Sequence, residues 1–258
     1  MPDKDLIITA IEAFDDNYIW MITAGGDSCA VVDPGDEAPV LETLEKHGLS
    51  LRYILLTHHH QDHIGGVPAL LDHCNPIVFG PADERIPFID HVCREGDKVC
   101  LPDLDASFLV LEVPAHTRSH IAFYGENCLF SGDTLFSLGC GRFFEGTASD
   151  MQTSLDKLAA LPATTKNYCA HEYTQSNCRF ALTVEPQNLT LQARSREVNT
   201  LRTDGKITLP TCLADELATN PFLRTRTASV VNAARKIDPQ ASAGISTMAA
   251  IRAWKDRF

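Results

Sequence analysis

The sequence predicts an α/β fold that ends in a helical region, and three observations support this prediction. A chain of 258 residues is long enough for one large domain with a smaller appendage. Its hydrophobic residues, 44% of the total, are sufficient for a core. Short β-rich runs alternate with turns and helical patterns through residues 6–170, and the strand patterns fade after His171.

Clusters of Gly, Asn and Asp, which are typical of turns, separate the expected strands. These strands cover Leu6–Phe14, Tyr18–Thr23, Cys29–Asp33, Arg52–Leu56, Ile77–Phe79, Phe108–Val113, Ile121–Tyr124, Cys128–Phe130 and Asn167–Ala170. Apolar residues at helical spacing predict helices over residues 40–49, 67–71 and 151–159. Residues 176–205 and 227–257 carry mostly helical patterns, which are broken by Pro186, Asp204-Gly205, Pro210, Pro221 and Pro239. We expect Gly48 to end the first of these helices, and Ser149 or Asp150 to be the N-cap of the third.

Composition and charge exclude several classes of function. The chain has 22 Lys and Arg against 34 Asp and Glu, a net charge of −12, which disfavours a nucleic-acid partner. Residues Met1–Asp5 lack the basic start of a secretion signal, and no apolar run approaches the roughly 18 residues of a membrane span. The nine cysteines form no CxxC pair. We therefore expect a cytoplasmic protein with reduced thiols and no membrane partner.

The strongest pattern is Thr57-His58-His59-His60-Gln61-Asp62-His63, directly after a predicted strand. Alternate residues of an extended chain share a face, so His58 and His60 can bind one metal ion while His59 points away. Asp62 and His63, where the chain turns toward the next helix, can bind a second ion. Closed structural zinc sites favour cysteine, so this set indicates a catalytic centre.

Further ligands are expected where later strands end, because loops at strand ends converge in α/β folds. His116, Asp133 and His171 each follow a predicted strand. With Asp133 as a bridge, the ligands divide into two sets: His58, His60 and His116 for the first metal, and Asp62, His63 and His171 for the second. We expect two divalent ions per chain, zinc foremost, with iron or manganese as alternatives.

The other polar residues near these patterns have simpler roles. We assign His47, His73 and His91 to the surface or to a satisfied core. His59 is expected to be packed or to support a ligand, and His120 to orient a ligand or to line the pocket. Asp33 is either an ordinary turn residue or a hydrogen-bond partner of a ligand histidine, and the residues alone leave both interpretations open.

Residues 57–63 match the THxHxDH signature of the metallo-β-lactamase superfamily at every fixed position. Within that superfamily the chain resembles the glyoxalase II, or hydroxyacylglutathione hydrolase, family from about residue 13 to the end. The matching segments are Asp15-Asp16-Asn17-Tyr18-Ile19-Trp20, His58 through Gly66, His116-Thr117 with His120, Ser131 through Phe136, Gly139 through Thr147, Ala170 through Thr174, and Arg252 through Phe258.

The resemblance implies a four-layer αββα metallo-β-lactamase fold, which we place at residues 1–171, with a helical substrate-binding domain at residues 172–258. It implies the same seven metal ligands, with Asp133 shared between two metals. It implies glutathione contacts from Arg142, Phe143, Phe144, Tyr173, Arg252 and Lys255. The family often has lysine where this chain has Arg142, and glycine where it has Ala115 and Ser119. It often has tyrosine where this chain has Phe144, so a hydroxyl is missing at that position here.

The resemblance also implies hydrolysis of S-D-lactoylglutathione to glutathione and D-lactate, in methylglyoxal detoxification. We expect direct attack by metal-bound hydroxide, with Asp62 and Asp133 as the catalytic carboxylates that accept its hydrogen bond. Arg252 and Lys255, at helical i,i+3 spacing, would attract the glutathione carboxylates. We expect a monomer whose partner is a small-molecule glutathione thioester.

The main alternative is a persulfide dioxygenase with a single iron on the same fold. A one-metal site needs fewer ligands and an open position for oxygen. The complete second set of Asp62, His63 and His171 favours the hydrolase, as do Arg252 and Lys255. A β-lactamase, an RNA-processing nuclease and a non-catalytic binding protein are weaker alternatives.

Overall fold

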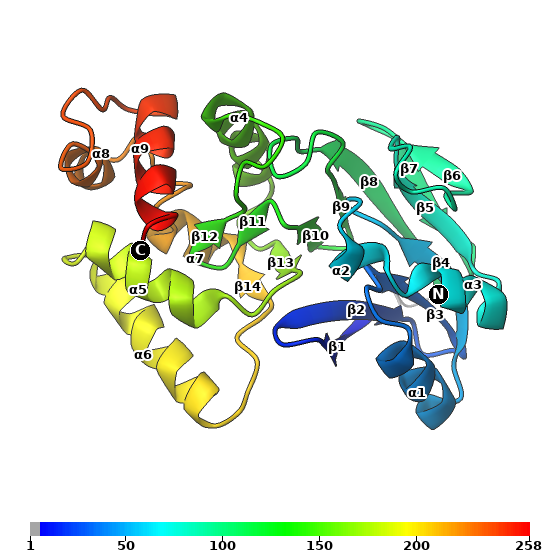
Figure 1. Cartoon of the computed structure of the whole chain (residues 1–258). Helices are drawn as coiled ribbons and strands as arrows, with labels where there is room; N and C mark the ends of the chain where they lie inside the picture. Colours follow the sequence, from blue (N-terminus) through cyan, green and yellow to red (C-terminus); the bar gives the residue numbers. More distant parts are fainter. Residues whose placement is uncertain (1–5) are drawn as a thin grey trace. The chain divides into compact units, whose positions relative to one another are not determined.

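The computed structural model describes residues 6–258, so the expectation about an amino-terminal leader, which rests on residues 1–5, lies outside the described residues. The chain divides into two compact units (Figure 1). The amino-terminal unit runs to Glu112 and includes Ser119–Gly132, and the carboxyl-terminal unit comprises Val113–Arg118 and Asp133–Phe258. No helix within residues 6–258 is both long and apolar enough to cross a membrane.

A six-stranded sheet in the order β1 to β6 forms half of the amino-terminal unit. The first three strands pair antiparallel, and β3 to β6 pair parallel. The strands are β1 (Ile7–Ala13), β2 (Asn17–Thr23), β3 (Ser28–Val32), β4 (Ser50–Leu55), β5 (Ile77–Pro81) and β6 (His91–Cys93). The helices between them are α1 (Ala38–His47), α2 (Gln61–Ile64) and α3 (Val67–Cys74).

Helices α1 and α3 cover one face of this sheet (Figure 1). Val40 and Leu44 of α1 and Val67 and Leu70 of α3 pack in one core cluster with apolar residues of β1 to β5. Helix α1 ends at Gly48 as predicted, because glycine adopts the left-handed φ of 62° at low cost. Amphipathic helices thus bury their apolar faces on the sheet.

The part of the second six-stranded sheet that belongs to this unit is an antiparallel meander in the order β7, β8, β9, β10. Phe108 and Phe130 contact each other edge to face at 5.7 Å between ring centroids. The strands are β7 (Lys98–Leu101), β8 (Ala106–Glu112), β9 (Ile121–Gly125) and β10 (Cys128–Gly132), with a 3₁₀ turn at Pro102–Leu104.

The carboxyl-terminal unit is mostly helical, and its α5 and α6 lie side by side (Figure 1). Leu138, Cys178, Ala181 and Leu191 form a buried cluster between these helices and the preceding loop. The helices are α4 (Ala148–Ala159), α5 (Thr174–Val184), α6 (Leu189–Thr203), α7 (Leu213–Thr219), α8 (Ala228–Ala234) and α9 (Ile245–Lys255). The strands are β11 (Leu135–Phe136), β12 (Gly139–Cys140), β13 (Lys166–Cys169) and β14 (Thr211–Cys212).

All nine predicted strands are present within two residues of the expected bounds. The sequence patterns missed β6, β7, β11, β12 and β14, and also helix α7. These strands have two to four residues each. Such short segments show too few alternations of apolar and polar side chains to predict a strand.

Helix α4 begins at Ala148, three residues earlier than predicted, because its N-cap is Thr147 and not Ser149 or Asp150. The Thr147 hydroxyl accepts a hydrogen bond from the Asp150 backbone amide at 3.3 Å. The Asp150 carboxylate in turn accepts one from the Thr147 amide at 2.8 Å. This capping box satisfies two amides that the first helical turn leaves without partners.

Thr147→Ala is expected to lower the free energy of unfolding by about 0.5–2 kcal/mol, because it removes the cap of α4. Urea unfolding followed by circular dichroism measures this change. Thr153→Ala is the matched control: its hydroxyl bonds the Ser149 carbonyl within the same helix. Alanine is a good helix former there, so no loss is expected. Equal destabilisation by both substitutions would contradict the role of the cap.

Candidate metal centre

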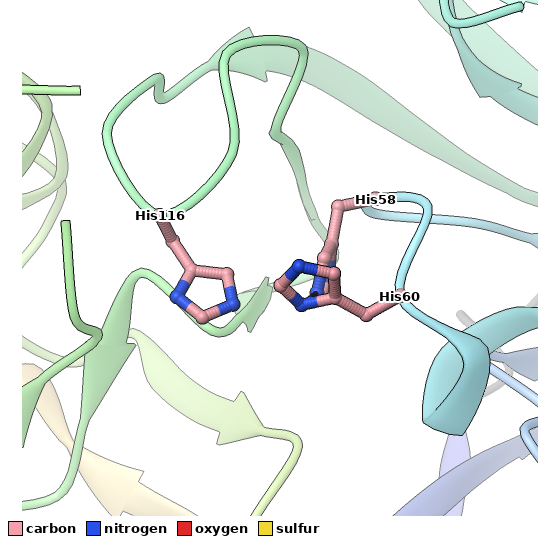
Figure 2. A group of neighbouring side chains, drawn as sticks. All are labelled: His58, His60 and His116. Carbon is pink, nitrogen blue, oxygen red and sulfur yellow. Dashed lines mark hydrogen bonds between the residues drawn. The ribbon is translucent and has the colours of Figure 1, made fainter. Parts of the chain in front are cut away.

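His58 and His60 lie on the loop that leads from β4 into α2, and Figure 2 shows their rings turned toward each other. The Nε2 atom of His58 is 3.0 Å from Nδ1 of His60. His59 instead faces the Asp83 carboxylate, with 3.5 Å between Nδ1 and Oδ2. The predicted alternation of the three side chains is therefore confirmed.

Hydrogen bonds determine which nitrogen of His58 is available to a metal. The Thr57 hydroxyl donates its only hydrogen to Asp33 Oδ2 at 2.7 Å and lies 3.0 Å from Nδ1 of His58. Thr57 can therefore only accept from His58, so Nδ1 carries the proton. Nε2 is then the unprotonated nitrogen, the one whose lone pair is suited to bind a metal.

Asp33 supports a second histidine in the same way. Its Oδ2 atom is 3.1 Å from Nδ1 of His63, and its Oδ1 accepts from the Thr57 amide at 2.7 Å. His63 is completely buried, so this carboxylate decides its tautomer and leaves Nε2 as the ligand atom. Of the two interpretations of Asp33, the structure supports that of a hydrogen-bond partner, because Asp33 contacts the candidate ligand His63 directly and His58 through Thr57.

Asp62 and His63 both lie on the short helix α2, with 3.5 Å between Oδ2 of Asp62 and Nε2 of His63. The side-chain amide of Asn17, at the start of β2, donates to Oδ2 and to the carbonyl of Asp62 at 3.1 and 3.3 Å. Sequence reasoning assigned no role to Asn17. A buried amide at the end of a hairpin was the feature that could have indicated one.

In the carboxyl-terminal unit, Asp133 has a different histidine at each of its oxygens. Oδ2 is 3.3 Å from Nε2 of His116, and Oδ1 is 3.3 Å from Nε2 of His171. Figure 2 shows His116 on the loop that follows β8. Its Nδ1 lies 3.1 Å from the carbonyl of Arg142, which can only accept, so Nδ1 carries the proton and Nε2 is the unprotonated nitrogen. A carboxylate with this arrangement is suited to bridge two metals.

The spacing of the donor atoms provides a test of metal binding. Tetrahedral coordination with bonds of about 2.0–2.1 Å separates neighbouring ligand atoms by about 3.3 Å. The four donor pairs described above have separations of 3.0, 3.5, 3.3 and 3.3 Å. The nitrogen and oxygen donors within each unit therefore fit divalent metal ions.

His120 is buried and its ring stacks on that of His58, with 4.6 Å between centroids. It thus supports a ligand ring, in agreement with one of the two roles expected for it. Gly132 allows this packing: a Cβ atom there would lie 2.4 Å from Thr57 Oγ1 and 2.8 Å from the His120 ring. The remaining histidines, His47, His73 and His91, are exposed as predicted.

Three cations gather around Asp256 in the carboxyl-terminal unit. The buried Arg252 donates to Asp256 Oδ1 from Nε at 3.0 Å and to the Cys140 carbonyl from Nη1 at 3.0 Å. The exposed Arg142 lies 3.7 Å from the same carboxylate. Burial, with the charge of Arg252 adding to it, lowers the pKa of Lys255 to about 8. Asp256 carries one negative charge against the positive charges of the three cations, so the cluster as a whole is positively charged.

Aromatic rings pack against two of the candidate ligands. Tyr173 stacks on His171 at 4.7 Å and 5° between planes. Phe144, which is 60% exposed, contacts His116 edge to face at 5.2 Å. Phe143 is half-buried. Phe144, which stands where the family often has tyrosine, therefore contacts His116 through its ring.

Two family models together match nearly the whole chain. The model described as the metallo-β-lactamase superfamily matches residues 14–171, and the one described as the hydroxyacylglutathione hydrolase C-terminus matches residues 172–258. A hydroxyacylglutathione hydrolase of Aliivibrio salmonicida is 53% identical over 98% of this chain and 100% of its own length. The chain belongs to the hydroxyacylglutathione hydrolase family. Another member, from Pseudomonas fluorescens, is 50% identical over 97% of this chain and 99% of its own length.

Solved structures show the same fold at low sequence identity. BLEG-1, a B3 metallo-β-lactamase, superposes with a TM-score of 0.64 and 23% identity over 84% of this chain and 99% of its own. ETHE1 from Myxococcus xanthus superposes with a TM-score of 0.65 and 23% identity, over 96% of this chain and 98% of its own. The predicted fold class is confirmed: a metallo-β-lactamase fold with a carboxyl-terminal helical region.

Membership of the hydroxyacylglutathione hydrolase family, together with these His and Asp donors, implies that the chain binds divalent metal ions. Asp33, His58 and His63 each offer a ligand atom within 4.8 Å of the other two. Since Asp33 is engaged by Thr57 and His63, we assign it a supporting role.

Proposed function

We propose that the protein is a metal-dependent thioester hydrolase that converts S-D-lactoylglutathione and related S-2-hydroxyacylglutathiones to glutathione and D-lactate. In this role it performs the second step of methylglyoxal detoxification. The observation that carries the proposal is Asp133, whose two oxygens each face a different histidine nitrogen at 3.3 Å. The full-length relatives named hydroxyacylglutathione hydrolase support the same substrate class.

Seven side chains would hold two metals, which we propose to be zinc. The first set is His58, His60, His116 and Asp133, and the second is Asp62, His63, His171 and Asp133. Divalent ions in such a site supply Lewis acidity, which activates water at neutral pH and stabilises negative charge on the thioester oxygen. The nitrogen-rich donor set and the spacing of its atoms suit zinc, with iron or manganese as alternatives.

The side chains around this centre hold the protons in place. Asp33 and the Arg142 carbonyl keep the protons of His58 (through Thr57), His63 and His116 on Nδ1. Asp62 and Asp133 accept a hydrogen bond from the attacking water. The water oxygen adds to the thioester carbonyl carbon while one of its protons passes to a carboxylate. The carbon–sulfur bond then breaks and the glutathione thiolate leaves, and the second water proton is lost to solvent from the carboxyl group of the D-lactate product. A thiolate needs no strong acid to depart, so no further proton donor is required.

The glutathione part of the substrate would bind the cation cluster around Asp256. Its carboxylates complement Arg142 and Lys255, and Arg252 orients the cluster through its bonds to Asp256 and to the Cys140 carbonyl. Tyr173, Phe143 and Phe144 would contact the peptide part. We propose residues 172–258 as the substrate-binding domain and residues 1–171 as the catalytic domain.

The KM for the glutathione thioester is expected to rise by about 10-fold as the pH increases through about 8. The pKa of Lys255 is lowered from 10.5 to about 8, so its ammonium is charged below that pH and neutral above it. Only the charged form attracts a carboxylate. Lys255→Arg keeps the charge at all these pH values and should remove the dependence. A Lys255→Arg profile identical to the wild-type profile would contradict this assignment.

Hydrolysis of S-D-lactoylglutathione before and after chelation tests the proposed function directly. We expect fast hydrolysis that chelation abolishes and added zinc restores, with two metals per chain by elemental analysis. No hydrolysis by fully metallated protein, with one iron per chain, would instead support a persulfide dioxygenase. We propose a cytoplasmic monomer, in which all nine cysteines are free thiols. Size-exclusion chromatography with light scattering tests the monomer.

A further inference from the structure

Asp83 follows strand β5, and its side chain is only 5% exposed. Its Oδ2 atom accepts from the Ser119 hydroxyl at 2.5 Å and from Nη2 of Arg85 at 2.7 Å. Its Oδ1 atom accepts from Nε and the backbone amide of Arg85 at 2.8 and 3.0 Å. No pattern in the sequence singled out Asp83, and the function described above does not use it.

Two contacts of Asp83 lead to the neighbours of His58. His59, between His58 and His60 in the chain, has its Nδ1 atom 3.5 Å from Asp83 Oδ2. Ser119 directly precedes His120, whose ring stacks on that of His58 at 4.6 Å and 18°. One carboxylate therefore lies against the side chain of His59, the residue between His58 and His60, and hydrogen-bonds Ser119, the residue next to the ring that packs against His58.

The charge of Asp83 is maintained by its own partners. The guanidinium of Arg85 holds the pKa of this carboxyl well below its usual range, and the Ser119 hydroxyl acts in the same direction. At neutral pH both oxygens are therefore acceptors only. Of the three residues described above, Arg85 and Ser119 donate to these oxygens, and His59 can donate when its Nδ1 carries a proton.

We propose that Asp83 is a positioning residue that holds His58 and His60 in the orientation needed to bind a divalent metal. This inference rests on the proposed metal centre and extends it to a residue outside the ligand set. Asp83→Asn replaces an acceptor oxygen with an NH₂ group that faces other donors, so at least one contact is lost. Loss of a partner that orients ligands typically costs 10–100-fold in metal affinity.

The chain offers a closely matched control in the carboxyl-terminal unit. The side chain of Glu185 is 4% exposed, accepts from Nε and Nη2 of Arg224 at 2.8 and 3.1 Å, and accepts from the Ser229 hydroxyl at 2.5 Å. Glu185 therefore has an arginine and a serine as partners, as Asp83 does, but none of its described contacts is to a proposed metal ligand. Glu185→Gln makes the same chemical change in an equivalent buried network.

The test compares zinc affinity, measured by chelator competition, in full-length wild type, Asp83→Asn and Glu185→Gln. We expect Asp83→Asn to weaken binding of the first zinc by about 10–100-fold and to shift the visible absorption of the cobalt-substituted protein. Glu185→Gln should leave both unchanged, and we expect urea unfolding to show that this variant too is less stable than the wild type. Ser119→Ala removes one contact of Asp83 and should weaken zinc binding less than Asp83→Asn does. If Asp83→Asn does not fold, Ser119→Ala replaces it in the test.

Wild-type affinity in Asp83→Asn, or equal weakening in Asp83→Asn and Glu185→Gln, would overturn the inference. In either case the wild type would still bind zinc and hydrolyse the thioester, so the proposed function would stand. Failure of the wild type itself to bind zinc would overturn both. The readouts therefore separate the positioning role of Asp83 from the function of the centre that it supports.

Discussion

Asp133→Asn is expected to lower kcat/KM for S-D-lactoylglutathione by about 10³-fold or more and to reduce the metal content below two ions per chain. The carboxylate offers one oxygen to His116 and the other to His171, both at 3.3 Å. Asparagine keeps the shape, but one side becomes an NH₂ donor and the charge disappears. It can no longer bridge two cations, so metal binding and activation of water are lost together.

The measurement combines steady-state kinetics with elemental analysis of the same preparation. Asp156→Asn is the control, because it makes the same chemical change at an exposed ion pair with Arg226, 2.6 Å between Nη2 and Oδ2. Such pairs contribute little to stability, so activity and metal content should stay at wild-type values. An Asp133→Asn protein with two metals and wild-type kcat would remove Asp133 from the centre.

The double substitution Arg252→Ala with Lys255→Ala is expected to raise KM by about 100-fold while kcat changes far less. Both side chains belong to the cation cluster around Asp256, which we propose binds the glutathione carboxylates. Binding energy lost equally from the ground state and the transition state appears in KM. Arg252 is also buried, so its removal leaves the Cys140 carbonyl and Asp256 without their donor, and some stability is lost as well.

Lys255→Ala alone separates substrate binding from this structural effect, because Lys255 is the less buried of the two. Lys236→Ala with Arg257→Ala makes the same change in net charge at exposed positions of the same unit. That control should leave KM unchanged. If the cluster variant showed a wild-type KM, or if the control raised KM equally, the cluster would not be the glutathione site.

Much of the candidate centre could be predicted because its donors are concentrated in one short segment. Alternation in an extended chain is a local property, so it correctly brought His58 and His60 together and turned His59 away. The strands before the later ligands were also predicted, since their apolar patterns are long enough to recognise. The assignments of all seven ligands to two metals remain proposals.

The parts that sequence reasoning missed depend on contacts between distant residues. Asn17 reaches Asp62 across 45 positions, and Asp83 reaches Ser119 across 36. Arg252, which the resemblance places at the glutathione site, is buried and bonds a carbonyl 112 residues away, and no sequence pattern indicated that contact. No local pattern encodes which distant side chain will face a given polar group.

By itself, the sequence determined the chemical identity of the donors and the local geometry of His58 to His63, because neighbouring residues and extended backbone decide these features. Only the tertiary structure decided which nitrogen of His58, His63 and His116 carries the proton and which is suited to bind a metal. That choice depends on Asp33, Thr57 and the carbonyl of Arg142, which lie up to 30 residues from the rings they bond. A ligand's type is a property of its residue, but its protonation depends on the partner that folding places beside it.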